Sequence, residues 1–172
     1  MPAVEVVRTY LELTDPVALR GVPFTNPRAH VRSLAPHAVG EYRRLYRDVG
    51  ERWHWHDRLA WSDDQLAVYL ASPDVTVSEL LVRDESAGFF ELRRHATDVE
   101  IAYFGLMPQF IGRGLGGALL TRAVEDAWAM GASRVWLHTC TLDSPHALPN
   151  YRARGFQEFK SEQLAIEIVE TA

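Results

Sequence analysis

The stretch Ile101–Ala127, IAYFGLMPQFIGRGLGGALLTRAVEDA, decides the fold, because its residue pattern changes twice along its length. It opens with an apolar run of strand length, which Pro108 ends, since proline cannot donate to a sheet ladder. Glycines follow, and apolar residues then recur at helical spacing: Leu115, Leu119, Leu120, Ala123, Val124 and Ala127. The stretch therefore predicts a strand, a glycine-rich turn and a helix.

The glycines of this turn stand where the predicted helix begins: Gly112, Gly114, Gly116 and Gly117. The first N–H groups of a helix have no intrahelical partner, and the helix dipole adds partial positive charge there. Glycines let an anion approach the backbone closely, and Arg113 adds a full positive charge. A tight turn or a close helix–sheet contact needs only one or two glycines, so the pattern favours a bound phosphate.

Two known phosphate-binding motifs fit the turn poorly. Residues 112–117 match the letters of the dinucleotide fingerprint G-x-G-x-x-G. That fingerprint normally lies on the first strand–helix turn of a doubly wound sheet, whereas this turn lies late in the chain, after consecutive strands. A Walker A loop is excluded because no Gly-Lys-Ser/Thr follows.

The segment Phe110–Leu120, FIGRGLGGALL, resembles the acetyl-CoA-binding signature of the GNAT N-acetyltransferase superfamily, R/Q-x-x-G-x-G/A. When Gly114 and Gly116 are its glycines, its first position falls on Ile111, which is neither Arg nor Gln. A register that starts at Gln109 fits the letters better. We prefer the first register because it places Leu119 and Leu120 where the family's helix has its leucine pair.

The later segment Asp143–Phe156, DSPHALPNYRARGF, resembles the family's second motif, which ends in Tyr-x-x-x-Gly-Phe. The two motifs have the family's order and spacing and cover about residues 100–156. The resemblance implies a GNAT-like fold, acetyl-CoA as cofactor and N-acetyltransferase activity. It also implies cofactor contacts from the strand end, the turn and the second motif: Leu106, Met107, Gly112, Arg113, Gly114, Leu115, Gly116, Gly117, Ser144 and Tyr151.

The rest of the chain predicts an α/β fold with a mixed sheet, in which an antiparallel meander precedes a parallel β-α-β unit and helices cover both faces. Residues 1–172 are expected to form a single domain. We predict strands at 4–13, 75–83, 88–94, 99–107 and 134–141, and a last strand or strands within 156–169. Turns are predicted at 84–88 and 95–98, a loop at 14–27, and helices at 36–52, 63–71 and 145–154, the second of them capped by Ser62 and Gln65.

Composition excludes several classes of function. The net charge is −5, with 18 basic and 23 acidic residues, which predicts neither a nucleic-acid surface nor a polybasic membrane patch. No apolar stretch is long enough to cross a membrane, and the N-terminus shows no signal-peptide pattern. A lone cysteine, Cys140, excludes an internal disulfide and suits a cytoplasmic location. A homodimer is common among proteins that the chain resembles.

An aromatic segment lies between the first two predicted helices, with Trp53, Trp55 and Trp61 around His54 and His56. These tryptophans either pack a helix–helix corner or line an acceptor pocket, since paired helices form one wall of the acceptor site in the family. Trp53, Trp55 and, from a later strand, His138 are our candidate acceptor contacts. Metal binding by the two histidines is disfavoured because the sequence supplies no evident third ligand.

Acetyl transfer to an amine requires a base, donors for the oxyanion and a proton or hydrogen bond for the leaving thiolate. Glu100, at the start of the strand before the turn, is the predicted base, because apolar neighbours would raise its pKa. Glu91 is the reserve candidate. Strand alternation puts Glu100 on one face with Ala102, Phe104 and Leu106, unless a bulge intervenes.

The resemblance makes Tyr151 the predicted acid and assigns the oxyanion donor to the backbone N–H of Leu106 or Met107. Cys140 is disfavoured as a nucleophile because no activating partner can be named. The predicted acceptor is a small-molecule or peptide amine. A rival hypothesis is a non-catalytic module that binds acyl-CoA without releasing its thiol.

Overall fold

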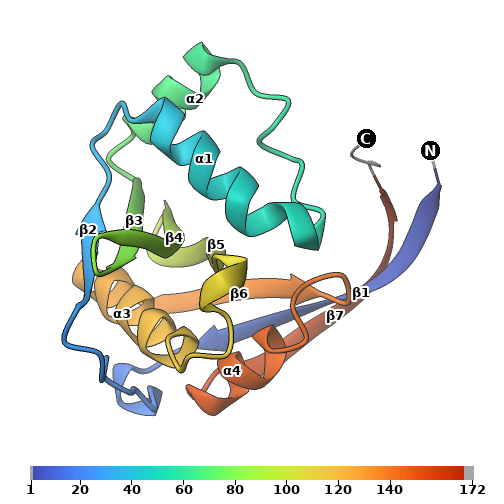
Figure 1. Cartoon of the computed structure of the whole chain (residues 1–172). Helices are drawn as coiled ribbons and strands as arrows, with labels where there is room; N and C mark the ends of the chain where they lie inside the picture. The colour runs from blue at the N-terminus through green and yellow to red at the C-terminus, as the bar shows by residue number, and fades with distance from the viewer. Residues whose placement is uncertain (1, 169–172) are drawn as a thin grey trace.

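The computed structural model describes residues 2–168, whose strands form one seven-stranded mixed sheet with helices on both faces (Figure 1). The strand order is β2-β3-β4-β5-β6-β1-β7. The strands are β1 Ala3–Leu13, β2 Ala29–Ser33, β3 Val75–Val82, β4 Glu85–His95, β5 Asp98–Leu106, β6 Arg134–Cys140 and β7 Gln157–Glu167. The helices are α1 Val39–Gly50, α2 Asp63–Leu70, α3 Gly116–Ala129 and α4 Ala147–Ala153, with short 3-10 turns at Pro16–Ala18, Glu51–Trp53 and Pro108–Phe110.

The predicted mixed sheet is confirmed. Strands β2 to β5 form an antiparallel meander, and β5 pairs in parallel with β6 across the connecting helix α3. The apolar face predicted for this helix is buried against the sheet, with Leu119, Ala123 and Ala127 each at 0% exposure. Pro108 ends the run of β5 by opening a 3-10 turn. Helices α1 and α2 cover the opposite face of the meander (Figure 1).

Strand β1 lies in the interior of the sheet, between β6 and β7, and is antiparallel to both. Its pairing with β6 begins at Arg8, opposite Cys140, so residues 3–7 extend beyond the end of β6. There they pair with residues 163–167 of β7 as a two-stranded ribbon, which carries both ends of the described chain (Figure 1). Because β1 runs against β5 and β6, this ribbon projects at the edge of the sheet where those two strands end.

Several predicted boundaries were wrong. The expected turn at 84–88 is only two residues long, because Arg83 and Asp84 both adopt left-handed backbone conformations (φ 53° and 64°), as a tight hairpin requires. The strand β2 was missed, since five residues give too short an alternation to stand out from the loop before it. The last segment is one strand that ends at Glu167, and Val169 lies outside the described residues.

The helices also differ slightly from prediction. Helix α1 begins at Val39 rather than near Pro36, and a 3-10 turn extends it to Trp53. The predicted cap of α2 is confirmed as a capping box in which Ser62 and Gln65 bond each other's backbone N–H. Within residues 2–168, no helix is both long and apolar enough to span a membrane.

Glu79 is a buried carboxylate that ties α1 to the meander. It accepts hydrogen bonds from Arg32 of β2 (2.7 Å), Arg44 of α1 (2.9 Å) and Ser86 of β4 (2.7 Å). Burial alone would raise the pKa of Glu79, but these three donors prevail and lower it below its usual 4.5. The folded state therefore stabilises the ionised form of the Glu79 carboxyl group.

We expect Glu79 to make the stability of the fold sensitive to acid. Because its pKa is lower in the folded state, its contribution is present above about pH 4.5 and is lost as the pH falls through the folded-state pKa. Glu79→Gln should lower the free energy of unfolding at pH 7 by about 1–3 kcal/mol. Below pH 4.5, the free energy of unfolding should decrease less steeply with falling pH in this variant than in wild type. Urea unfolding over a pH series measures both effects, with Glu125→Gln on exposed α3 surface as control. Equal acid sensitivity in wild type and Glu79→Gln would contradict the assignment.

Candidate active site

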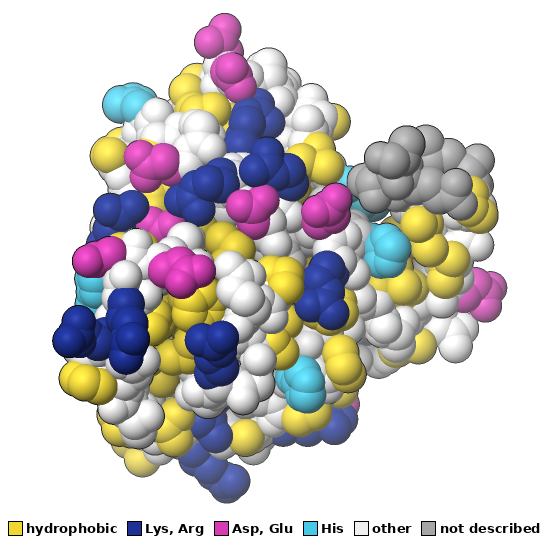
Figure 2. Space-filling model, viewed as in Figure 1, with side chains coloured by type: hydrophobic (Ala, Val, Ile, Leu, Met, Phe, Trp, Pro, Cys, Tyr) yellow, Lys and Arg dark blue, Asp and Glu magenta, His cyan; other side chains and the backbone are white. Residues whose placement is uncertain are grey.

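A cleft of about 770 Å³ opens at the edge of the sheet where β5 and β6 end. One wall is the loop after α1, residues 53–58, and the floor is the second half of β5. The glycine turn and the segment after β6 close one end, and residues 165–166 of the β1–β7 ribbon stand at the other. Figure 2 shows the ribbon projecting beside the body of the molecule, with histidine side chains where the two meet.

The cleft exists because β5 and β6 part. Their parallel ladder ends with the pair Glu100–Trp136, although β5 continues to Leu106 and β6 to Cys140. The N–H of Met107 donates to Ala87 O on β4 at 2.8 Å. Because successive N–H groups of a strand point to opposite sides, the N–H of Leu106 points away from β4 and toward the opening. The parted strands thus leave backbone groups of β5 free for a ligand.

A β-bulge in β5 decides which side chains face the part of the cleft beside the loop at residues 53–58, where the sequence predicts the acceptor end. Tyr103 lies opposite Glu91 and Ile101 opposite Leu92, so Ala102 is an extra residue in β5. Directly opposed residues share a face, which places Glu100 with Tyr103 on the side covered by α1. Simple alternation, which put Glu100 with Phe104 and Leu106, is therefore corrected by the bulge.

The glycine turn is shaped to receive an anionic group. Gly112 and Gly114 have left-handed backbones (φ 84° and 76°), and a side chain at either position would project into open space. Helix α3 starts at Gly116, and its N-cap residue Leu115 offers no side-chain cap to the first N–H groups. Asn150 of α4 donates to Gly116 O at 3.1 Å and holds the two helices together.

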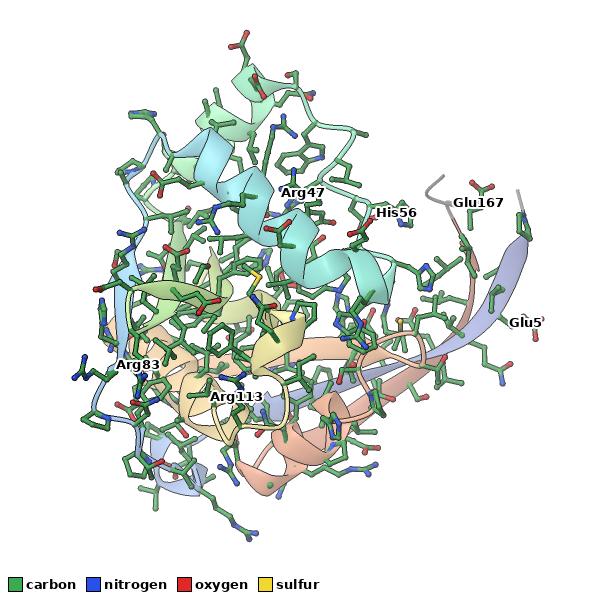
Figure 3. The ribbon with its side chains drawn as sticks, in the orientation of Figure 1. Glu5, Arg47, His56, Arg83, Arg113 and Glu167 are labelled. Carbon is green, nitrogen blue, oxygen red and sulfur yellow. The ribbon has the colours of Figure 1, made fainter. Side chains whose placement is uncertain are left out.

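Most predicted cofactor residues line the cleft: Leu106, Gly112, Gly114, Leu115, Gly116, Gly117, Ser144 and Tyr151. Met107 and Arg113 are outside its lining. Met107 is buried and its N–H is already bonded to Ala87, so Leu106 is the better oxyanion donor of the two. The guanidinium of Arg113 lies 5.0 Å from the centre of the Phe110 ring, beside the turn (Figure 3).

Glu100 lines the cleft and has polar neighbours rather than the apolar ones expected. Its Oε1 lies 2.8 Å from Nε2 of His95, whose ring packs against Trp136, and Arg93 stands directly opposite it on β4. Its side chain is only 15% exposed. This carboxylate therefore faces the acceptor end from a defined position.

Glu91, the reserve base, lies outside the cleft lining and is fully buried. It accepts hydrogen bonds from the hydroxyls of Tyr42 and Tyr69, both at 2.5 Å, and from Arg58 Nη2 at 2.9 Å. Both of its carboxylate oxygens are thus engaged within the protein. Its function in this structure is to anchor Arg58 and the loop that carries it.

Tyr151 lies on α4 and lines the cleft with only 7% of its surface exposed. Its ring meets those of Phe104 and Phe156 edge-on, with centroids 6.3 Å and 6.1 Å away. Burial, and secondarily the charge of Asp143, raises the pKa of Tyr151. The hydroxyl therefore stays protonated at neutral pH and can serve as a donor.

The tryptophans of the aromatic segment differ in position, and two of them line the cleft. Trp55 packs against Tyr103, with ring centroids 4.9 Å apart, and also lines the cleft together with Trp53. Trp61 is outside the lining and packs on Tyr69 and Arg58. His56 Nδ1 lies 2.9 Å from His54 O. Among the described residues, no group of three or more His, Cys, Asp or Glu is arranged to hold a metal ion.

His138 also lines the cleft, from β6. The cleft walls limit its hydration, and this desolvation, followed by the charge of Arg8, lowers the pKa of His138. Sequence reasoning missed three arginines in the lining, Arg8, Arg58 and Arg93. No local sequence pattern identifies these arginines as cleft residues, because they come from strand and loop segments that lie far apart in the chain.

Comparison with known proteins agrees with this arrangement. The model of the acetyltransferase (GNAT) family matches residues 38–156. Mycothiol acetyltransferase of Corynebacterium aurimucosum is 38% identical over 74 residues, which are 41% of this chain and 24% of that protein. The match thus spans about a quarter of the length of that curated relative.

Solved structures share the fold at low identity. A GCN5-related N-acetyltransferase from Kribbella flavida is 16% identical, with a TM-score of 0.68 over 92% of this chain and 57% of its own. An aminoglycoside acetyltransferase from an uncultured soil metagenomic sample, solved with sisomicin, is 14% identical, with a TM-score of 0.63 over 84% of this chain and 97% of its own. The chain belongs to the GNAT acetyltransferase family, whose cofactor is acetyl-CoA.

Proposed function

We propose that this chain transfers the acetyl group of acetyl-CoA to a primary amine by direct attack, with both substrates bound in the one cleft. The observation that carries the proposal is the parting of β5 and β6 beside a left-handed glycine turn, with Glu100 on the acceptor side. Bound acetyl-CoA supplies a reactive thioester.

The residues present fit the cofactor. The open backbone at Gly112 and Gly114 and the uncapped first turn of α3 suit a diphosphate, because they offer N–H groups and partial positive charge without side chains in the way. The freed edge of β5 next to Leu106 suits the amide groups of the pantetheine arm, which can pair with a strand edge as a peptide does.

The catalytic residues take distinct roles in this proposal. The carboxylate of Glu100 accepts a proton from the amine, directly or through one water. The N–H of Leu106 donates to the oxygen on which negative charge develops. The hydroxyl of Tyr151, kept protonated by burial, donates to the departing sulfur.

On the acceptor side, Trp53, Trp55 and His138 form the walls. One relative is named for mycothiol and one solved neighbour is an aminoglycoside acetyltransferase bound to sisomicin, which supports a small-molecule amine as acceptor here. The cytoplasmic location, the single-domain organisation and the homodimer expected from the sequence remain predictions.

Thermal unfolding with and without ligand tests the cofactor, and thiol release with a panel of amines tests the reaction. At 100 times its Kd, CoA should stabilise the fold by about 2.7 kcal/mol and raise Tm by roughly 5–10 °C, whereas NAD should have no effect. A shift with NAD alone would favour a dinucleotide-binding protein. CoA binding without thiol release for any amine would favour the non-catalytic module.

Gly114→Ala should weaken CoA binding by about 10- to 100-fold, because a Cβ would occupy the space through which the diphosphate approaches. Gly131→Ala is the matched control, since Gly131 has the same left-handed backbone (φ 84°) and open surroundings but lies beyond the far end of α3. Titration of the Tm shift against CoA concentration separates lost affinity from general destabilisation. Equal CoA affinity in both variants would remove the turn from the cofactor site.

A further inference from the structure

Arg8 is a cationic residue of the cleft that has no role in the proposed reaction. It lies on β1, directly opposite Cys140 of β6 and Glu162 of β7, at the point where the ribbon leaves the body of the sheet. Its side chain lines the cleft on the side away from the glycine turn. It thus stands at the acceptor end, across from the loop that carries Trp53 and Trp55.

The guanidinium of Arg8 has no partner within residues 2–168. Its Nε is buried without a hydrogen bond, and no carboxylate of that range forms an ion pair with it. Glu162, its direct neighbour on β7, is paired instead with Lys160, at 2.7 Å. Arg8 as a whole is only partly buried and lines the cleft, so the part of its guanidinium that faces the cleft can receive an acceptor from a ligand.

The other charges of the cleft are already engaged or differently placed. Arg58 is paired with Glu91 at 2.9 Å, and Glu100 with His95 at 2.8 Å. Arg93 stands directly opposite Glu100 and lies over the ring of Tyr69, 5.6 Å from its centre. Arg8 is therefore the cleft cation best placed to meet an anion away from the proposed base.

The surroundings of Arg8 strengthen such a contact. Val6, Leu164 and Ile166 share its face of the ribbon, as their positions in the β1–β7 register show, and Ile166 itself lines the cleft. His56 on the loop also lines the cleft and is labelled in Figure 3. The apolar side chains of the ribbon lower the local dielectric next to Arg8, and charges then interact more strongly than in water.

We infer that Arg8 binds a carboxylate of the acceptor, so that the natural acceptors are amines that also carry a carboxylate. This inference rests on the acetyl transfer proposed above. A guanidinium in a cleft that also contains the carboxylates of Asp57, Glu100 and Asp143 suits one negative charge better than the double charge of a phosphate.

The sheet register also limits the spacing between amine and carboxylate. Glu100 lies opposite Trp136 and Arg8 opposite Cys140, four positions apart on β6, which separates their backbones by roughly 13 Å along the strand. An acceptor that contacts both Glu100 and Arg8 must therefore have its amine and its carboxylate separated by several bonds, as in an ω-amino acid or a short peptide.

The test compares acceptors in matched pairs: γ-aminobutyrate, δ-aminovalerate and ε-aminocaproate, and the neutral primary amide of each. For at least one pair, wild type should show a kcat/KM for the carboxylate about 10- to 100-fold above that for the amide, as a charge-assisted contact provides. In Arg8→Gln the ratio should fall to about 1, and Arg8→Lys should keep part of it. Arg28→Gln, on the opposite edge of the sheet, should keep the wild-type ratio.

Each outcome decides the matter. Equal rates for carboxylates and amides in wild type, or a ratio that persists in Arg8→Gln, would overturn the inference while leaving acetyl transfer intact. Acetylation of amines that carry no carboxylate, but of neither series, would overturn it as well. Acetylation of no amine at all would instead reject the proposed function. If thermal unfolding shows that Arg8→Gln folds poorly, the carboxylate-to-amide ratio of kcat/KM in Arg8→Lys gives the answer, and a ratio equal to that of wild type would overturn the inference.

Discussion

Replacing Glu100 with glutamine is expected to lower kcat by about 100- to 10,000-fold, with little change in the affinity for CoA. Glutamine keeps the size of the side chain and can still contact His95, but it cannot accept the proton of the amine. The glycine turn that binds the cofactor is formed by other residues, so CoA should raise Tm as it does in wild type. Thiol release at saturating substrates measures kcat.

Tyr151→Phe belongs in the same experiment, because phenylalanine keeps the edge-on packing with Phe104 and Phe156 and removes only the hydroxyl. It too should lower kcat more than CoA affinity. Glu125→Gln, an exposed change on α3, is the control for a lost surface charge. If both Glu100→Gln and Tyr151→Phe turn over at the wild-type rate, neither residue has the role proposed for it.

Glu91→Ala is expected to lower the free energy of unfolding by about 3–5 kcal/mol, as removal of one partner of a buried ion pair does. The change leaves the guanidinium of Arg58, only 12% exposed, without its carboxylate. It also removes the acceptor of two tyrosine hydroxyls, those of Tyr42 and Tyr69. Urea unfolding monitored by tryptophan fluorescence measures the loss.

Glu91→Gln should cost less than Glu91→Ala, because an amide oxygen still accepts from one hydroxyl. Since Arg58 belongs to the loop at residues 53–58, both variants should also raise the KM of the acceptor. A loss below about 1 kcal/mol in Glu91→Ala would show that the network does not hold this loop in place.

The sequence predicted best the parts of the fold whose signals are local. The strand, turn and helix of residues 101–127 are encoded by consecutive residues, and the structure has all three. The capping box at Ser62 follows from a four-residue pattern and is present. These features need no knowledge of what lies across the sheet.

What the sequence could not predict depends on contacts between distant segments. No local pattern tells that β1 lies between β6 and β7, and for that reason Arg8 was overlooked as a residue of the cleft. The burial of Glu91 was equally unpredictable, because the alternation of side chains along a strand is compatible with a residue in the cleft or in the core. Its burial follows from Tyr42, Tyr69 and Arg58, which come from three other parts of the chain.

The position of β1 has a consequence for how the protein is made. Residues 3–13 leave the ribosome before their partners, residues 134–140 and 157–167, have been synthesised. The interior strand β1 therefore stays unpaired while the meander and α3 fold. Until β6 and β7 emerge, its exposed edges are open to pairing with other nascent chains, so slow translation of residues 134–167 should favour aggregation over folding.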